Sequence, residues 1–196
     1  MESMKQQKLD RRVEILTVAR EVLAEKGLEA TKVSEIVKRA GIAQGTFYLY
    51  FESKNALIQA LAEEMMGKVF AAVSQSLLES KTFEQGVKHG LRAAFCSMSE
   101  YLDIYNILIN GCAVVVADQK DLRTLFDPYY ELLETYIEKW QADGAVDAKL
   151  DPKITSRLIV SLTDQAVDDY YIQESATTVE TYIENLTRFV VKALKA

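Results

Sequence analysis

Side chains that can hydrogen-bond to phosphates and base edges gather in residues 31–54, TKVSEIVKRAGIAQGTFYLYFESK. Hydroxyl and ammonium groups suit phosphate oxygens. The amide of Gln44 can pair with adenine, and the ring of Tyr50 can pack either on a thymine methyl group or inside the protein. Gly45 carries no side chain, so the protein backbone there could approach the sugar-phosphate backbone of DNA closely. The candidate DNA-binding residues are Thr31, Ser34, Gln44, Gly45, Thr46, Tyr48, Tyr50 and Lys54.

Two short helices are predicted to position these side chains. The first has apolar residues at helical spacing, namely Val33, Ile36, Val37 and Ala40. Thr31 is its expected N-cap, and Gly41 can take the left-handed conformation that ends it. Phe47 and Phe51 are four residues apart and predict a second short helix with one buried face. Two such helices joined by a tight turn are typical of a helix-turn-helix, whose second helix enters the DNA major groove.

This segment resembles the N-terminal domain of TetR-type (tetracycline-repressor-like) transcriptional regulators. The matching pieces are Glu25-Lys26-Gly27, Thr31, Ala40-Gly41-Ile42, the run Gly45–Phe51 and Ser53-Lys54. The resemblance covers the first quarter of the chain. It implies an all-α protein with a three-helix helix-turn-helix domain over residues 1–54. A larger helical ligand-binding and dimerisation domain would follow over residues 55–196, giving about nine helices in total.

Helical periodicity and breaks predict the remaining elements. Ser53 is the expected N-cap of a long helix that ties the two domains together, and Pro152 suits a first helical turn. The expected helices outside the motif are 11–26, 53–80, 82–99, 101–117, 120–143, 152–173 and 177–195.

Charge is distributed unevenly along the 196 residues. The net charge is −6, but residues 1–54 carry ten Lys and Arg against eight Asp and Glu. Such a chain is not expected to coat nucleic acid without specificity, because phosphate binding requires a local basic patch. The candidate cations for that patch are Lys5, Lys8, Arg11, Arg12, Lys32, Lys38, Arg39 and Lys54.

Other site types find little support in the sequence. His89 is the only histidine, and the two cysteines, Cys96 and Cys112, lack the spacing of a metal or redox site. We therefore expect no metal, no cofactor and no enzymatic activity. Apolar runs are too short for a membrane span, and the N-terminus lacks a signal-peptide core, so a cytoplasmic protein without a membrane partner is expected.

The resemblance implies a small-molecule pocket among the middle helices. Its candidate lining residues are Phe70, Phe95, Tyr101, Tyr105, Asn106, Asn110, Phe126, Tyr130, Trp140, Asp164 and Asp168. Core packing is the alternative for each aromatic residue. The acidic surplus favours a neutral or cationic lipophilic effector over an acyl-CoA. An acyl-CoA stays open, because a second group could form a local anion site: Lys88, Arg92, Arg123 and Arg157.

The last two predicted helices carry more apolar surface than one flank can bury, so a two-fold contact is expected there. The candidate interface residues are Leu158, Leu162, Ala166, Tyr182, Leu186, Phe189 and Val190. The alternative is that both helices lie inside the monomer. These expectations describe a homodimeric repressor of a palindromic double-stranded operator, released by a small lipophilic effector. Activation in place of repression stays open. The other candidate is a small-molecule binding protein or carrier without sequence-specific DNA binding.

Overall fold

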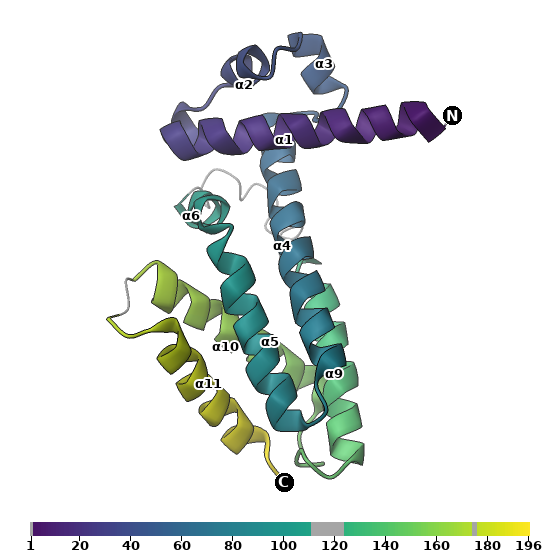
Figure 1. Cartoon of the computed structure of the whole chain (residues 1–196), viewed down its shortest axis with the longest axis vertical. Coiled ribbons are helices and arrows are strands. Elements are labelled where there is room, and N and C mark those ends of the chain that lie inside the picture. Colours follow the sequence, from purple (N-terminus) through teal and green to yellow (C-terminus); the bar gives the residue numbers. More distant parts are fainter. Residues whose placement is uncertain (1, 111–123, 174–175) are drawn as a thin grey trace. The chain divides into compact units, whose positions relative to one another are not determined.

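The computed structural model describes residues 2–110, 124–173 and 176–196, and within them the chain is all-α, as predicted. The only β-type pairing in these residues is an isolated bridge between Val146 and Lys195. None of the helices in these residues is long and apolar enough to cross a membrane. The helices (Figure 1) are α1 Glu2–Ala30, α2 Val33–Arg39, α3 Gln44–Tyr48, α4 Lys54–Glu79, α5 Phe83–Ser99, α6 Leu102–Asn110, α9 Asp127–Ala142, α10 Pro152–Tyr171 and α11 Val179–Leu194.

Most predicted helix ends agree with the structure. The hydroxyl of Ser53 accepts a hydrogen bond from the backbone N–H of Ala56 at 3.0 Å, so the expected cap of α4 is confirmed. Pro152 lies in the first turn of α10. Helix α1 begins nine residues earlier than predicted, at Glu2, and its regular backbone breaks at Gly27, where φ is 77°.

Contacts divide the chain into two compact units. The N-terminal unit comprises 2–65 together with 103–110, and the C-terminal unit comprises 66–102, 124–173 and 176–196. The predicted division after residue 54 falls at the start of α4, whereas contacts place it after Met65. The first turns of α4 account for the difference, because they bury Leu57, Ile58 and Leu61 in the N-terminal unit.

The N-terminal unit has its core between α1 and the helix-turn-helix. Phe47 is fully buried, and its ring centroid lies 5.6 Å from that of Phe51, which confirms the apolar face predicted from their spacing. The other buried apolar side chains of α1 to α3 and the start of α4 are Ile15, Leu16, Ala19, Val22, Leu23, Leu28, Ile36, Val37, Leu57, Ile58, Ala60, Leu61, Ala62 and Met65.

Helix α6 joins this unit through an ion pair with α1. The guanidinium of Arg20 donates from Nε to Oδ2 of Asp103 at 2.6 Å and from Nη2 to Oδ1 at 2.7 Å. Desolvation raises the pKa of Asp103, but the hydrogen bonds and charge of Arg20 more than offset it, so the pKa lies below its ordinary value. The pair therefore joins elements 83 residues apart in the sequence and stabilises the ionised carboxylate.

In the C-terminal unit, α10 packs against α9 and α5, and α11 packs against α5. Trp140 of α9 is buried and contacts Phe83 of α5, with ring centroids 5.1 Å apart. Gly86 makes room for the indole, because a Cβ built there would lie 2.6 Å from Cζ2 of Trp140. Tyr129 of α9 donates its hydroxyl to the carbonyl of Met66 at 2.6 Å.

Gly86→Ala is expected to lower the free energy of unfolding by about 1–3 kcal/mol, because the indole that it meets is packed on its other sides. Gly67→Ala is the matched control, since a Cβ there meets nothing within 4 Å. In the middle of α4 this change should raise stability by about 0.5–1 kcal/mol. Urea denaturation measures both, and equal effects of the two substitutions would contradict the packing argument.

Candidate nucleic-acid interface

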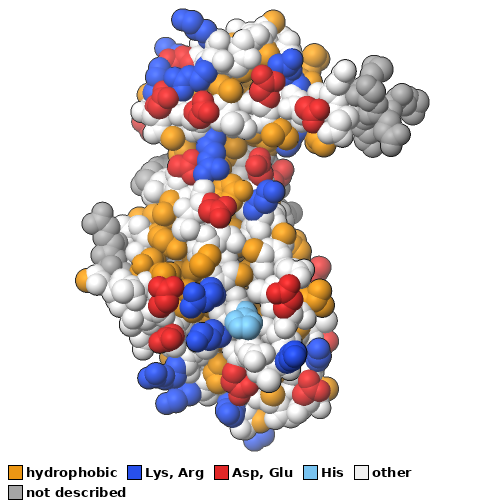
Figure 2. Space-filling model, in the orientation of Figure 1, with side chains coloured by type: hydrophobic (Ala, Val, Ile, Leu, Met, Phe, Trp, Pro, Cys, Tyr) orange, Lys and Arg blue, Asp and Glu red, His pale blue; other side chains and the backbone are white. Residues whose placement is uncertain are grey.

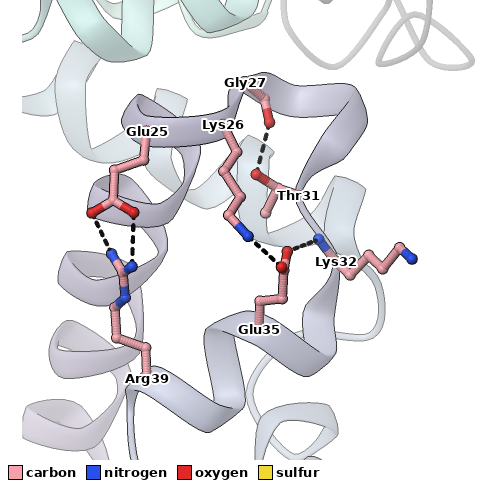
Figure 3. Close-up of polar contacts among 7 residues, drawn as sticks. All are labelled: Glu25, Lys26, Gly27, Thr31, Lys32, Glu35 and Arg39. Carbon is pink, nitrogen blue, oxygen red and sulfur yellow. Dashed lines mark hydrogen bonds and ion pairs between the residues drawn. The ribbon is translucent and has the colours of Figure 1, made fainter.

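Helix α2 is held against the end of α1 by a surface network of charged side chains (Figure 3). Both guanidinium Nη atoms of Arg39 donate to the carboxylate of Glu25, at 2.6 and 2.7 Å. Lys26 of α1 pairs with Glu35 of α2, and the same carboxylate accepts the backbone N–H of Lys32 at 3.2 Å. The bond from Arg39 lowers the pKa of Glu25, and the bond from Lys26 lowers that of Glu35. Single exposed pairs contribute little to stability, but this network fixes the orientation of α2.

Thr31 differs from its predicted role. Its side chain is buried, and its hydroxyl donates to the carbonyl of Gly27 at 2.7 Å, as Figure 3 shows. Lys32 is the N-cap of α2, so the prediction that Thr31 caps this helix is wrong. This hydroxyl is buried and donates to the carbonyl of Gly27, so it is not available to a phosphate, and Thr31 is not part of the accessible surface of the motif.

Lys54 is also engaged inside the N-terminal unit. Its ammonium donates to the carbonyl of Leu28 at 2.8 Å and to that of Thr31 at 3.0 Å. Carbonyls that follow a helix break lack intrahelical donors, so this lysine satisfies groups that would otherwise need water. Its first role is therefore structural, and any phosphate contact would use only its remaining N–H.

Helix α3 has one buried face and one exposed face. Phe47 is buried, whereas Gln44, Gly45 and Tyr48 are exposed, and the ring of Tyr48 stands edge-on to Phe47 at 5.4 Å between centroids. Gly41, with φ of 63°, makes the predicted left-handed turn before this helix. The structure thus brings three of the predicted DNA-binding residues onto one accessible surface.

The other candidates of the motif lie beside this surface. Ser34 of α2 is exposed, whereas Thr46 and Tyr50 are half-buried. Leu49, the C-cap of α3, was not among the predicted DNA-binding residues, although its side chain is 74% exposed. Its position between two tyrosines and four residues after Gly45 was the available signal.

Nothing in the described part of the chain accounts for a glycine at position 45. Its φ lies outside the left-handed region, and an added Cβ would meet nothing within 4 Å. Glycine in a helix costs about 0.5–1 kcal/mol relative to alanine. A reason for this residue therefore has to be sought in what approaches α3 from outside.

Several expected phosphate-binding cations are already engaged within the protein. The guanidinium of Arg39 is bound to α1, as described above. Arg11 pairs with Glu14 at 2.6 Å, and the guanidinium carbon of Arg12 lies 5.4 Å from the ring centroid of Phe51. The carboxylates of Glu25 and Glu14 therefore offset the charges of Arg39 and Arg11, whereas Arg12 lies over an aromatic ring and keeps its charge.

Three lysines remain available in the described part of this unit. Lys8, Lys32 and Lys38 are exposed and have no ion pair with the described side chains. Figure 3 shows the ammonium of Lys32 pointing away from the charged network. The side chain of Lys5 lies outside the described part. Figure 2 shows basic and acidic side chains interleaved over the viewed face of the unit, so its positive potential is local.

The predicted pocket residues are divided between the two units. Tyr105 and Asn106 belong to the N-terminal unit, and the side chain of Asn110 lies outside the described residues. The others that are described belong to the C-terminal unit: Phe70, Phe95, Tyr101, Phe126, Tyr130, Trp140, Asp164 and Asp168. Of the aromatic ones, Phe95 and Trp140 are buried core residues.

The described basic side chains of the expected anion site already have partners within the C-terminal unit. Lys88 of α5 lies 3.9 Å from Glu184 and Arg92 lies 3.3 Å from Glu180, both on α11. Arg157 instead lies over the ring of Tyr130, 4.8 Å from its centroid, while Arg123 is outside the described residues. The described members of the expected anion site therefore belong to two separate clusters.

Asp164 and Asp168 lie one turn apart on α10. Desolvation and the charge of Asp168 both raise the pKa of Asp164. Such a carboxylate pair would favour a cation over an anion. Within the described residues, no group of three or more His, Cys, Asp or Glu side chains could hold a metal ion.

The predicted dimer residues fall into buried and exposed groups. Ala166, Leu186 and Val190 are buried within the C-terminal unit, so these three predicted interface residues pack its core and offer little surface to a second copy. Leu158 and Phe189 are 64% and 61% exposed, respectively. Two further candidates, Leu162 and Tyr182, are half-buried. Ile154, four residues before Leu158, is 60% exposed and was not among the predicted residues.

Comparisons with known proteins agree with this architecture. Residues 15–61 match the family model described as bacterial regulatory proteins, tetR family, and residues 87–194 match tetracyclin repressor-like, C-terminal domain. The uncharacterized HTH-type transcriptional regulator YvdT of Bacillus subtilis is 35% identical over 181 residues, which are 92% of this chain and 93% of that protein. The HTH-type transcriptional repressor KstR2 of Rhodococcus jostii is 28% identical over 193 residues, covering 95% and 92%.

A solved structure gives the same fold. The crystal structure of the transcriptional regulator FadR from Bacillus subtilis in complex with stearoyl-CoA has a TM-score of 0.76 and 20% identity. The match covers 93% of this chain and 98% of that one.

Exposed lysines without an ion pair and arginines already paired with carboxylates should contribute differently to the salt dependence of DNA binding. Lys38→Gln should reduce the slope of log affinity against log salt by about 0.9 for each phosphate contact that is lost. Arg39→Gln should leave the slope unchanged, because its charge is already neutralised by Glu25. Fluorescence anisotropy between about 50 and 200 mM salt measures both slopes. Equal reductions in both variants would contradict the proposed division.

Proposed function

The chain belongs to the TetR family of bacterial transcriptional regulators, and from that premise we propose that it is a homodimeric repressor. Without ligand it holds a near-palindromic operator, and a small lipophilic effector releases it. Its relative KstR2 is a transcriptional repressor by name, which supports repression over activation.

The exposed face of α3 is the observation that carries this proposal. Phe47 fixes the helix to the core, and Gln44, Gly45 and Tyr48 face outward together. The amide can pair with a base edge, the phenol can donate to a phosphate, and the glycine admits close approach. A carrier without DNA preference would give no reason for the glycine.

A helix of five residues reads only a few base pairs, so affinity requires two copies. Two-fold dimers of helix-turn-helix proteins place their recognition helices about 34–36 Å apart, one DNA turn. The exposed apolar side chains of Ile154, Leu158 and Phe189 on α10 and α11 support a dimer contact at these helices. Burying them against a second copy removes apolar surface from water.

The proposed effector has an apolar chain. The C-terminal unit is rich in aromatic side chains, and FadR, which shares its fold, binds stearoyl-CoA. Lys88 and Arg92 already pair with glutamates, so recognition of the chain should outweigh recognition of phosphates. A difference of a few kcal/mol between the effector's affinities for the two states of the repressor suffices for release.

Selection from random duplex DNA at physiological salt tests the central proposal. We expect an enriched palindrome whose half-sites are about one turn apart. Gly45→Gln should weaken binding to that operator at least about tenfold, because the new side chain would occupy the space that the DNA backbone approaches. It should not lower stability, because an added Cβ at this position meets nothing within 4 Å in the free protein. Gly67→Gln, at an equally open position of α4, should bind normally. If Gly45→Gln bound the operator with wild-type affinity, that would contradict a close approach of DNA to residue 45.

The dimer contact predicts a change in oligomeric state. Leu158→Glu with Phe189→Glu should shift the solution mass from twice the 22.1 kDa chain to one chain, because it places charges in an apolar contact. Leu78→Glu alters an equally exposed residue of α4 and should leave the dimer intact. Light scattering after size-exclusion chromatography measures the mass. A dimer that persists in the double variant would place the contact elsewhere.

The effector class predicts a response to chain length. Stearoyl-CoA should release the selected operator and raise the melting temperature, whereas coenzyme A alone should do neither, because it lacks the apolar chain. Anisotropy and thermal denaturation measure the two effects. Equal responses to both compounds would contradict recognition of the chain.

A further inference from the structure

Leu49 is an exposed leucine at the C-terminal end of α3. It follows the last residue of α3, and 74% of its surface is accessible. Single exposed leucines are ordinary on protein surfaces, so exposure alone decides nothing. The position of Leu49 is more informative, because it is adjacent to the exposed Tyr48 on the face proposed to enter the major groove.

The backbone holds Leu49 on that surface. Its φ and ψ, −75° and −18°, continue the helical conformation, and its N–H bonds to the carbonyl of Thr46 at 3.2 Å. Residues four apart lie on the same face of a helix, so Leu49 lies one turn beyond Gly45. The face therefore has open space at residue 45, where an added Cβ would meet nothing within 4 Å, followed by a leucine side chain.

The chemistry of the leucine side chain restricts what it can read. It has no donor or acceptor, so it adds nothing to phosphate binding. Among the groups that distinguish base pairs in the major groove, the thymine 5-methyl is the apolar one. Gln44 and Tyr48 supply polar contacts on the same surface. An apolar side chain beside them complements a thymine methyl.

We propose that Leu49 is a specificity-determining residue of the operator complex, whose side chain packs on the 5-methyl group of a thymine. The open space at Gly45 lets α3 enter the groove far enough for this contact. The inference rests on the proposed operator binding and adds to it the residue that selects thymine over cytosine at one position of each half-site.

A cycle of changes in protein and DNA tests this contact. Each thymine of the selected operator is replaced in turn by deoxyuridine, which removes only the 5-methyl group. In the wild-type protein, deoxyuridine at one position of each half-site should weaken binding about fourfold per half-site, as expected for one buried methyl group. In Leu49→Ala that position should become insensitive to the methyl group. Sensitivity at other thymines, including any read by Tyr50, should persist.

The control is Leu78→Ala, which removes a leucine of similar exposure from α4. Its sensitivity to deoxyuridine should equal that of the wild type at every position. Thermal denaturation of Leu49→Ala should match the wild type, because an exposed side chain contributes little to packing.

The outcomes distinguish this inference from the proposed function. A selected operator whose deoxyuridine sensitivities are the same in wild type and Leu49→Ala overturns the role of Leu49 and leaves the repressor proposal standing. The role of Leu49 is supported if Leu49→Ala, and not Leu78→Ala, loses methyl sensitivity at one thymine of each half-site. Failure of the wild-type protein to select any sequence overturns both.

Discussion

The break of α1 at Gly27 is the constraint on which the DNA-reading module depends. A positive φ there redirects the chain and leaves carbonyls without helical donors. The hydroxyl of Thr31 binds the carbonyl of Gly27, and the ammonium of Lys54 binds those of Leu28 and Thr31. One buried hydroxyl and one lysine thus join the end of α1 to the starts of α2 and α4. The position of α3 follows, because the turn at Gly41 connects it to α2.

This arrangement separates structural charges from those left for DNA. Near the break, Arg39 and Lys26 are each paired with a glutamate, so the network that orients α2 uses up positive charge. Lys32 and Lys38 remain exposed on the same helix region. A protein of net charge −6 can therefore present a small basic surface at its reading helix while its other cations stabilise the fold.

The C-terminal unit shows the corresponding division among apolar side chains. On α11, Leu186 and Val190 face α5 and the core, whereas Phe189 faces outward. On α10, Leu158 is exposed and Ala166 is buried. Adjacent positions of one amphipathic helix thus serve two purposes, internal packing and a surface that a second copy can cover. The pattern of apolar residues along the sequence does not distinguish the two, because both require the same residue types.

Local patterns in the sequence determined most of the helices, though not the start of α1, together with the left-handed turn at Gly41, the cap at Ser53 and the buried face of Phe47. Each of these depends on neighbours within a few residues. They also sufficed to place Gln44, Gly45 and Tyr48 on one face. Only the tertiary structure decided that Lys54 binds the broken end of α1, and that α6 joins α1 through Arg20 and Asp103. Those roles are set by partners 26 and 83 residues away, which come into contact only when the helices pack.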